Sequence, residues 1–261
     1  MDIKELQVSD DIDSKKNHPW EYARSKVVLS ILRKYLKKHT SGSALDIGCG
    51  DVFFLTKFAD KYPDFDLIAV DTAFDEELIS KIASKNSNYN VKFFKDLQNV
   101  TNIDEANIIF MLDLIEHIED DVYFLKNLYS QSYISPNSII VITVPAFNYL
   151  YYNHDKWLGH YRRYSLSSLK QSIRASGFSY IEGGYFFTSL IIPRFIQNTI
   201  DKFRERHGVD KEGIGNYKGG AVQSFLYEKF LLFDFYFFRL FRFLGIKMPG
   251  LSTFVICKKS K

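Results

Sequence analysis

Short apolar segments alternate with helix-like segments over most of this 261-residue chain. The spacing of apolar residues predicts strands at 43–47, 66–70, 91–94, 107–112 and 138–144, and helices at 52–62, 75–86 and 120–132. Strands that alternate with helices form βαβ units, whose parallel sheet is covered by helices on both faces. The sequence therefore predicts an α/β fold.

Further elements flank this alternating region. Apolar residues recur at helical spacing over about 20–38. After an aromatic and basic loop at 147–164, Ser165 is a predicted N-cap for a helix that Gly177 ends. A sixth strand is predicted at 179–187, and Leu251–Lys258 is predicted to be an edge strand. The predicted organisation is a polar tail at 1–18, a main domain at 19–187 with 251–261, and a helical insertion at 188–250.

The insertion at 188–250 is rich in aromatic residues. We predict a helix at 189–203, a polar linker at 207–220 and a second helix within 225–244, on which Glu228, Arg239 and Arg242 share one side. One interpretation is that the second helix packs on the core and exposes this polar stripe. The other is a surface helix that meets a membrane interface or a lipid-like substrate.

The composition excludes several classes of protein. A net charge of +3, without a tract of Lys and Arg, argues against a nucleic-acid partner. Cys49 and Cys257 form no metal-binding pair, which is typical of a reducing compartment. Met1–Lys16 has no apolar core of a signal peptide, and no apolar run reaches the roughly 18 residues of a membrane span. We expect a cytoplasmic protein, with peripheral contact at the inner membrane face if the insertion meets lipid.

A strand that runs into Gly48-Cys49-Gly50 is typical of a nucleotide-binding turn. A dinucleotide site requires a third glycine, but Phe53 stands at that position, and Asp46 would repel a pyrophosphate. Asp46 instead suits a cationic or hydroxyl-bearing ligand.

Two later acids suit the rest of a nucleoside. Asp71 ends the next strand, where a carboxylate can accept both ribose hydroxyls, although it could also cap the following helix. Asp96 follows the third strand and could accept from an adenine amino group.

Together, Leu45–Gly50, Val70-Asp71 and Leu112–Asp121 resemble the class I S-adenosylmethionine-dependent methyltransferases. The likeness spans about 20–187, and Leu251–Lys258 resembles the last, antiparallel strand of that family. It implies a Rossmann-like, seven-stranded sheet with S-adenosylmethionine as cofactor. The implied cofactor-binding residues are Asp46, Gly48, Cys49, Gly50, Asp71, Thr72, Asp96, Leu97 and Leu112. Where the family often has a small residue after the glycine pair, this chain has Asp51-Val52.

Two histidine-bearing segments follow the fourth and fifth strands, whose ends open on the cofactor edge of the sheet. His117, His154 and His160 are therefore candidates for a general base. Alternatively, Asp113, Glu116, His117 and His160 could hold Mg²⁺, Mn²⁺ or Zn²⁺. That pattern resembles small-RNA 2′-O-methyltransferases and ubiquinone-pathway O-methyltransferases, which usually have Glu where Asp113 stands. A purely structural role is the third alternative, and a metal is not expected.

The loop after the fifth strand is also the predicted acceptor site. Its candidate acceptor-binding residues are Trp157, Tyr161, Arg162, Arg163 and Tyr164. Arginines suit a carboxylate or phosphate, and aromatic rings suit a ring or sugar face. Alternatively, one arginine pairs with Asp155 and braces the loop. The loop and His18–Arg24 resemble a broad bacterial and archaeal group of methyltransferases associated with surface glycans, lipids or specialised metabolites.

These observations favour methyl transfer to a small-molecule, glycan or lipid-linked acceptor, at an oxygen, with a histidine base. One alternative is a metal-dependent O-methyltransferase of the ubiquinone-pathway or RNA 2′-O type. Another is a non-catalytic S-adenosylmethionine-binding protein, against which the intact Asp46, Gly48, Gly50 and Asp71 argue.

Overall fold

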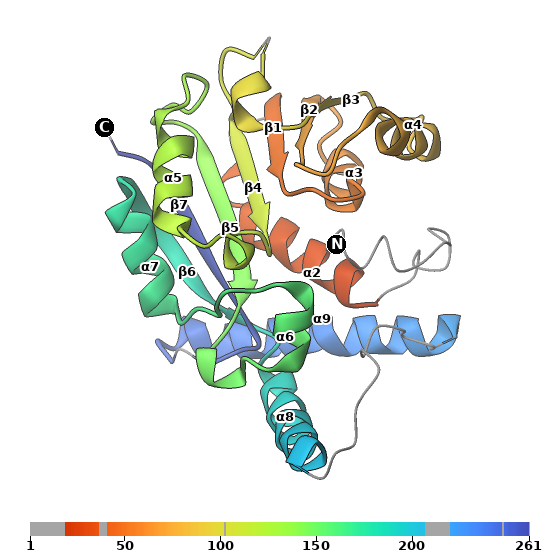
Figure 1. The fold of residues 1–261 in the computed structure, drawn as a ribbon, viewed down its shortest axis with the longest axis vertical. Helices are drawn as coiled ribbons and strands as arrows, with labels where there is room; N and C mark the ends of the chain where they lie inside the picture. Colours follow the sequence, from red (N-terminus) through yellow and green to blue (C-terminus); the bar gives the residue numbers. More distant parts are fainter. Residues whose placement is uncertain (1–18, 37–40, 102, 207–219, 247, 261) are drawn as a thin grey trace.

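The computed structural model describes residues 19–36, 41–101, 103–206, 220–246 and 248–260. Seven strands form one sheet in the order β3-β2-β1-β4-β5-β7-β6 (Figure 1). Their bounds are Gly42–Ile47 (β1), Phe65–Val70 (β2), Val91–Phe94 (β3), Ile108–Leu112 (β4), Ile139–Pro145 (β5), Phe178–Phe186 (β6) and Ser252–Lys259 (β7). The predicted Rossmann-like, seven-stranded sheet is confirmed.

Helices cover both faces of the sheet because the central strands are apolar on both sides. On β4, Ile108 and Phe110 belong to one buried cluster, whereas Ile109 and Met111 belong to the other. The first cluster includes residues of α2 (Pro19–Leu32), α3 (Phe53–Ala59), α4 (Glu76–Lys85) and α9 (Ala221–Phe243). The second includes residues of α5 (Asp121–Ser130) and α7 (Leu166–Ala175).

The last strand lies inside the sheet and not at its edge. β7 pairs antiparallel with both β5 and β6, and Ser252–Cys257 are buried. The prediction of an edge strand is therefore wrong, and β6 occupies that edge. The alternation read from the sequence did not distinguish a half-exposed strand from one covered on both faces.

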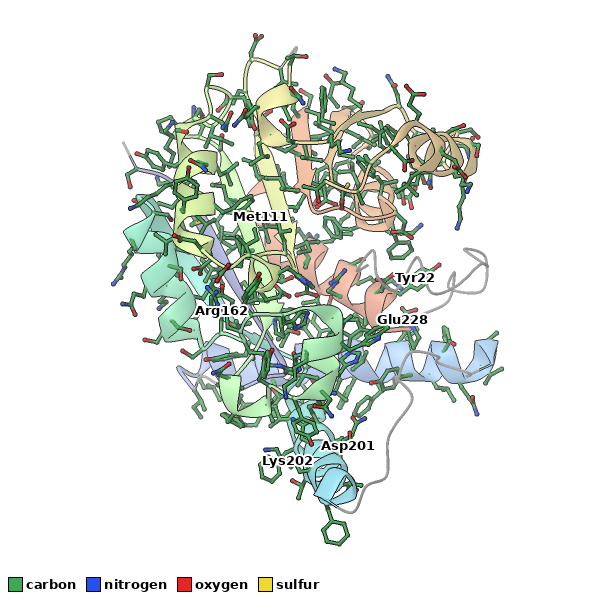
Figure 2. All side chains as sticks on the ribbon, in the orientation of Figure 1. Tyr22, Met111, Arg162, Asp201, Lys202 and Glu228 are labelled. Carbon is green, nitrogen blue, oxygen red and sulfur yellow. The ribbon has the colours of Figure 1, made fainter. Side chains whose placement is uncertain are left out.

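The segment between β6 and β7 contains η5 (Thr188–Leu190), α8 (Ile191–Arg206) and α9. Leu231 and Phe235 bury the inner side of α9, and Glu228 pairs with Lys26 of α2, which lies alongside α9 (Figures 1 and 2). The interpretation that this helix packs on the core is confirmed, but its solvated stripe does not include Glu228, which faces α2. The side chain of Arg242, the tail at 1–18 and the linker at 207–220, apart from Gly220, lie outside the described residues.

Candidate functional site

The turn after β1 is held between the ends of two neighbouring strands. Gly48 and Gly50 have φ values of 70° and 56°, which favour glycine. A Cβ on Gly48 would lie 2.6 Å from Cδ1 of Leu114, which follows β4. The turn is completed by Val52, whose φ of 58° is strained for a β-branched residue. The turn is thus formed without the small residue that the family often has after the glycine pair.

Asp71 connects this turn to the end of β2. Its Oδ2 accepts from the backbone N–H of Gly50 at 3.0 Å, and its Oδ1 accepts from that of Ala73 at 3.0 Å. A carboxylate oxygen has two acceptor sites, so each still has capacity for a ribose hydroxyl. The alternative role as cap of the next helix is wrong, because Asp75 caps α4 by accepting from the N–H of Leu78.

Asp46 lies within β1 and is almost fully buried. Burial raises the pKa of its carboxyl to about 7, with a smaller contribution from the nearby Asp71 and Asp51 and an opposing one from Arg24. A cationic ligand beside Asp46 would stabilise the carboxylate. The sulfonium and amino groups of S-adenosylmethionine supply such charges, so this acid fits the cofactor.

The remaining predicted cofactor residues lie around these strand ends with different exposures. Cys49 and Leu112 are buried, Leu97 is half-buried, and Thr72 and Asp96 are exposed. Asp96 caps η2 (Leu97–Asn99) by accepting from two backbone N–H groups and also accepts from the side chain of Asn99. Its contact with adenine stays a prediction.

A partly buried ion pair fixes the segment after β4. Asp113, with a φ of 55°, pairs with Arg24 of α2 and also accepts from Thr143 Oγ1 at 3.1 Å. Arg24 is buried, and its removal would leave the carboxylate of Asp113 without the cation that it pairs with. No role for Arg24 could be predicted from the sequence, because its partner is 89 residues away.

Glu116, His117 and His160 come together beside this segment. Their ligand atoms lie within 4.8 Å of one another, and the two imidazole rings meet edge to face at 4.5 Å. The backbone N–H of Tyr161 donates to the carbonyl of Glu116 at 2.7 Å, which ties the loop after β5 to the segment after β4. Two sequence segments about 40 residues apart thus form one site, as their strand ends imply.

Glu116 is fully buried, and neither of its carboxylate oxygens has a hydrogen-bond partner among the described residues. Burial raises the pKa of this carboxyl well above its ordinary value, and the charge of Asp113 raises it further. Burial therefore favours the neutral form of Glu116, and a cation against it would favour the carboxylate. Asp113 is not part of the cluster of possible metal ligands, since it pairs with Arg24.

Asp155 organises the loop that carries His160. It lies in α6 (Asn153–Leu158), is fully buried, and contacts His160 Nδ1 at 2.9 Å and Arg163 Nε at 2.7 Å. Although burial alone would raise its pKa, hydrogen bonds from His160 and Arg163 hold the pKa of Asp155 well below its ordinary value. The prediction that one arginine braces the loop through Asp155 is confirmed for Arg163.

Asp121 is a second anchor of the same loop and was missed in the sequence. Arg162 Nη1 donates to it at 3.1 Å, Tyr164 Oη at 2.9 Å and Ser172 Oγ at 2.8 Å. Arg162 thus lies beside the start of α5, as Figure 2 shows. Tyr161 and Trp157 are exposed, so of the five predicted acceptor residues they have the most open side chains.

The sequence model of a family described as a methyltransferase domain matches residues 20–182. The chain belongs to the class I S-adenosylmethionine-dependent methyltransferases. Its cofactor is S-adenosylmethionine. No curated protein matches the sequence.

Solved methyltransferases share the fold. A putative sarcosine dimethylglycine methyltransferase from Galdieria sulphuraria has a TM-score of 0.57 at 12% identity, over 92% of this chain and 86% of that one. Phosphoethanolamine N-methyltransferase 2 of Haemonchus contortus has a TM-score of 0.57 at 15% identity, over 100% of this chain and 60% of that one. A SAM-dependent methyltransferase from Archaeoglobus fulgidus has a TM-score of 0.50 at 19% identity, over 92% and 97%.

Proposed function

We propose that this methyltransferase transfers a methyl group to an oxygen of a small-molecule, glycan or lipid-linked acceptor, with His160 as general base. The observation that carries the proposal is the 2.9 Å contact between His160 Nδ1 and the buried carboxylate of Asp155. A carboxylate at Nδ1 favours the tautomer whose proton is on Nδ1, which leaves a basic lone pair on Nε2. It also stabilises the imidazolium that forms when His160 takes a proton.

S-adenosylmethionine supplies an electrophilic methyl group on a sulfonium. The acceptor oxygen forms a bond to the methyl carbon as the carbon–sulfur bond breaks and its electron pair goes to sulfur. His160 Nε2 takes the hydroxyl proton, and Asp155 offsets the new charge. Asp46 and Asp71 hold the cofactor from β1 and β2, and the exposed Tyr161 and Trp157 contact the acceptor.

The other two predicted bases are less suited to this role. Burial lowers the pKa of His154 to about 4, and the positive charge of Arg194 adds to the effect, so His154 is a weak base. The ring of His117 packs edge to face against the ring of His160, and it is the Nδ1 of His160 that contacts the buried carboxylate of Asp155. We therefore assign His117 the role of positioning the His160 ring.

The test is methyl transfer from labelled S-adenosylmethionine to a panel of phenolic, sugar and lipid-linked hydroxyl acceptors. His160→Gln should lower kcat by about 10²- to 10⁴-fold, the usual contribution of a general base, and leave cofactor affinity unchanged. His154→Gln, a change of the same type in the same loop, should keep most of the activity. Full activity in His160→Gln would contradict the assignment, as would an equal loss in both variants.

A second candidate is a metal-assisted transfer. The unpartnered, buried Glu116 carboxyl favours it, because a divalent cation held with His117 and His160 would satisfy both of its oxygens. Asp155 would then orient His160 as a metal ligand. The metal is supported if chelation abolishes activity, if Mn²⁺, Mg²⁺ or Zn²⁺ restores it, and if these ions restore no activity in Glu116→Gln. It is excluded if chelation leaves the activity unchanged.

A further inference from the structure

The outer faces of α8 and α9 are apolar, and none of the elements that the structure describes packs on them. On α8, the exposed large apolar side chains are Ile192, Phe195, Ile196, Ile200 and Phe203. On α9 they include Val222, Leu226, Phe233, Tyr236, Phe237 and Leu240, which lie on the side opposite the buried Leu231. Figure 1 shows α8 projecting away from the sheet, and α9 lying along the outer side of α2. Exposed apolar side chains grouped on one side of a helix in this way mark an interaction site.

The charges of α9 are sorted between its two faces. Glu228 is turned inward to Lys26 at 2.5 Å, and the buried Asp234 accepts from the backbone N–H groups of Thr188 and Ser189 at 2.9 and 2.8 Å. Lys229 is exposed, whereas Arg239, which is also exposed, donates from Nη1 to Ser30 Oγ of α2 at 3.1 Å. Among the α9 side chains that the structure describes, the exposed charges are therefore all positive. The outer face of α9 thus combines apolar side chains with the cation of Lys229 and, among its described residues, no exposed acid, which complements an anionic, partly apolar partner.

We propose that α8 and α9 dock this methyltransferase on the surface of an anionic lipid bilayer. Aromatic and aliphatic side chains with flanking cations are the signature of a helix that lies in the interface. In the described part of the chain, no helix has both the length and the apolar character needed to cross a membrane. The 23 residues of α9 extend over about 35 Å and so offer a long side to the bilayer.

Charge distinguishes this occupant from a second copy of the chain. Two copies that joined their α9 outer faces would bring their Lys229 side chains together without an exposed acid among the described α9 residues to offset them. Anionic headgroups attract each exposed Lys or Arg near the surface. The lipid surface is therefore the better partner.

Of the two helices, α8 is attached to the loop at 147–164, the proposed acceptor side of the site. Asn198 Nδ2 of α8 donates to the carbonyl of Leu150 at 2.7 Å, and Arg194 Nη2 contacts Asp155 at 3.4 Å. Asp155 is also the partner of His160. A bilayer bound at α8 would thus lie on the side from which the loop at 147–164 receives the acceptor. Docking itself does not depend on methyl transfer and is measured without an acceptor.

The experiment is flotation of the full chain with vesicles of phosphatidylcholine alone or mixed with phosphatidylglycerol. The wild type should float with the mixed vesicles. The double variant Phe233→Ser/Leu240→Ser should lose at least about tenfold in binding, because it lacks two exposed apolar side chains that would enter the bilayer. Lys229→Glu should weaken binding to the mixed vesicles by about fivefold or more. Tyr123→Ser, which changes an equally exposed ring on α5, should bind as the wild type does.

Cofactor-induced thermal stabilisation is measured in each variant and should be unchanged, which shows that the fold and the cofactor site are intact. The proposal is overturned if the wild type floats with neither vesicle, or if the Phe233/Leu240 variant floats as the wild type does. It is also overturned if light scattering shows a wild-type dimer that this variant abolishes while vesicle binding is absent, because a second copy would then cover the faces. Equal binding to both vesicle types would refute the anionic requirement.

Discussion

S-adenosylmethionine should bind this methyltransferase more tightly as the pH rises through 7, because of Asp46. Burial raises the pKa of its carboxyl to about 7 in the free protein, and the positive charges of the cofactor favour the carboxylate. Because the cofactor binds to the form with an ionised Asp46, a protein molecule whose Asp46 is protonated must release that proton on binding. At one pH unit below the pKa only about a tenth of the Asp46 carboxyls are ionised, which weakens the affinity about tenfold. The dissociation constant should therefore rise about tenfold from about pH 8 to about pH 6.

Isothermal titration calorimetry at both pH values measures this effect against Asp46→Asn. The amino group of the cofactor titrates equally with both proteins, so the difference between their pH profiles isolates Asp46. Asp46→Asn should bind more weakly at high pH and lose the tenfold difference. The control Asp66→Asn removes an exposed carboxylate near the amino end of β2, away from the carboxyl end at which Asp71 lies. It should keep the wild-type profile. Identical profiles for the wild type and Asp46→Asn would refute the reasoning.

Three further substitutions test other parts of the site. Asp71→Ala should abolish the thermal stabilisation by S-adenosylmethionine, and an unchanged shift in melting temperature would exclude this acid from the pocket. Gly48→Ala should lower the free energy of unfolding by about 1–3 kcal/mol and weaken cofactor binding, because its positive φ disfavours alanine and the new Cβ would clash with Leu114. Stability and affinity equal to those of the wild type would show that the turn adjusts. Tyr164→Phe should cost about 0.5–1.5 kcal/mol in chemical denaturation by removing the hydrogen bond to Asp121, with kcat retained; a large loss of kcat would instead indicate contact with the acceptor.

Most elements of the fold could be predicted because they depend on short-range patterns. β3 at Val91–Phe94 matches its predicted range, and Ser165 caps α7 by accepting from the N–H of Ser168, as its position before an apolar helix suggested. The place of β7 could not be predicted in the same way. Strand order depends on which neighbours cover Ser252–Cys257, and periodicity along the chain does not contain that information.

The site shows the same division. Asp46 and Asp71 follow from their position at the ends of successive strands, which is a local signal. The pairs Arg24–Asp113 and Arg162–Asp121 join residues 89 and 41 positions apart, and neither partner predicts the other. The sequence likewise showed the aromatic content of α9 but not which side of the helix would face outward.

The insertion of β7 between β5 and β6 has a consequence for how the chain folds. β5 and β6 cannot join one sheet until the strand that follows α8 and α9 reaches the space between them. Pairings between segments so far apart in the chain form slowly. During synthesis, β1 to β5 can assemble early, whereas α8 and α9 emerge while this half of the sheet is still open. Their apolar side chains are then accessible to chaperones or to a nearby bilayer before the native structure is complete.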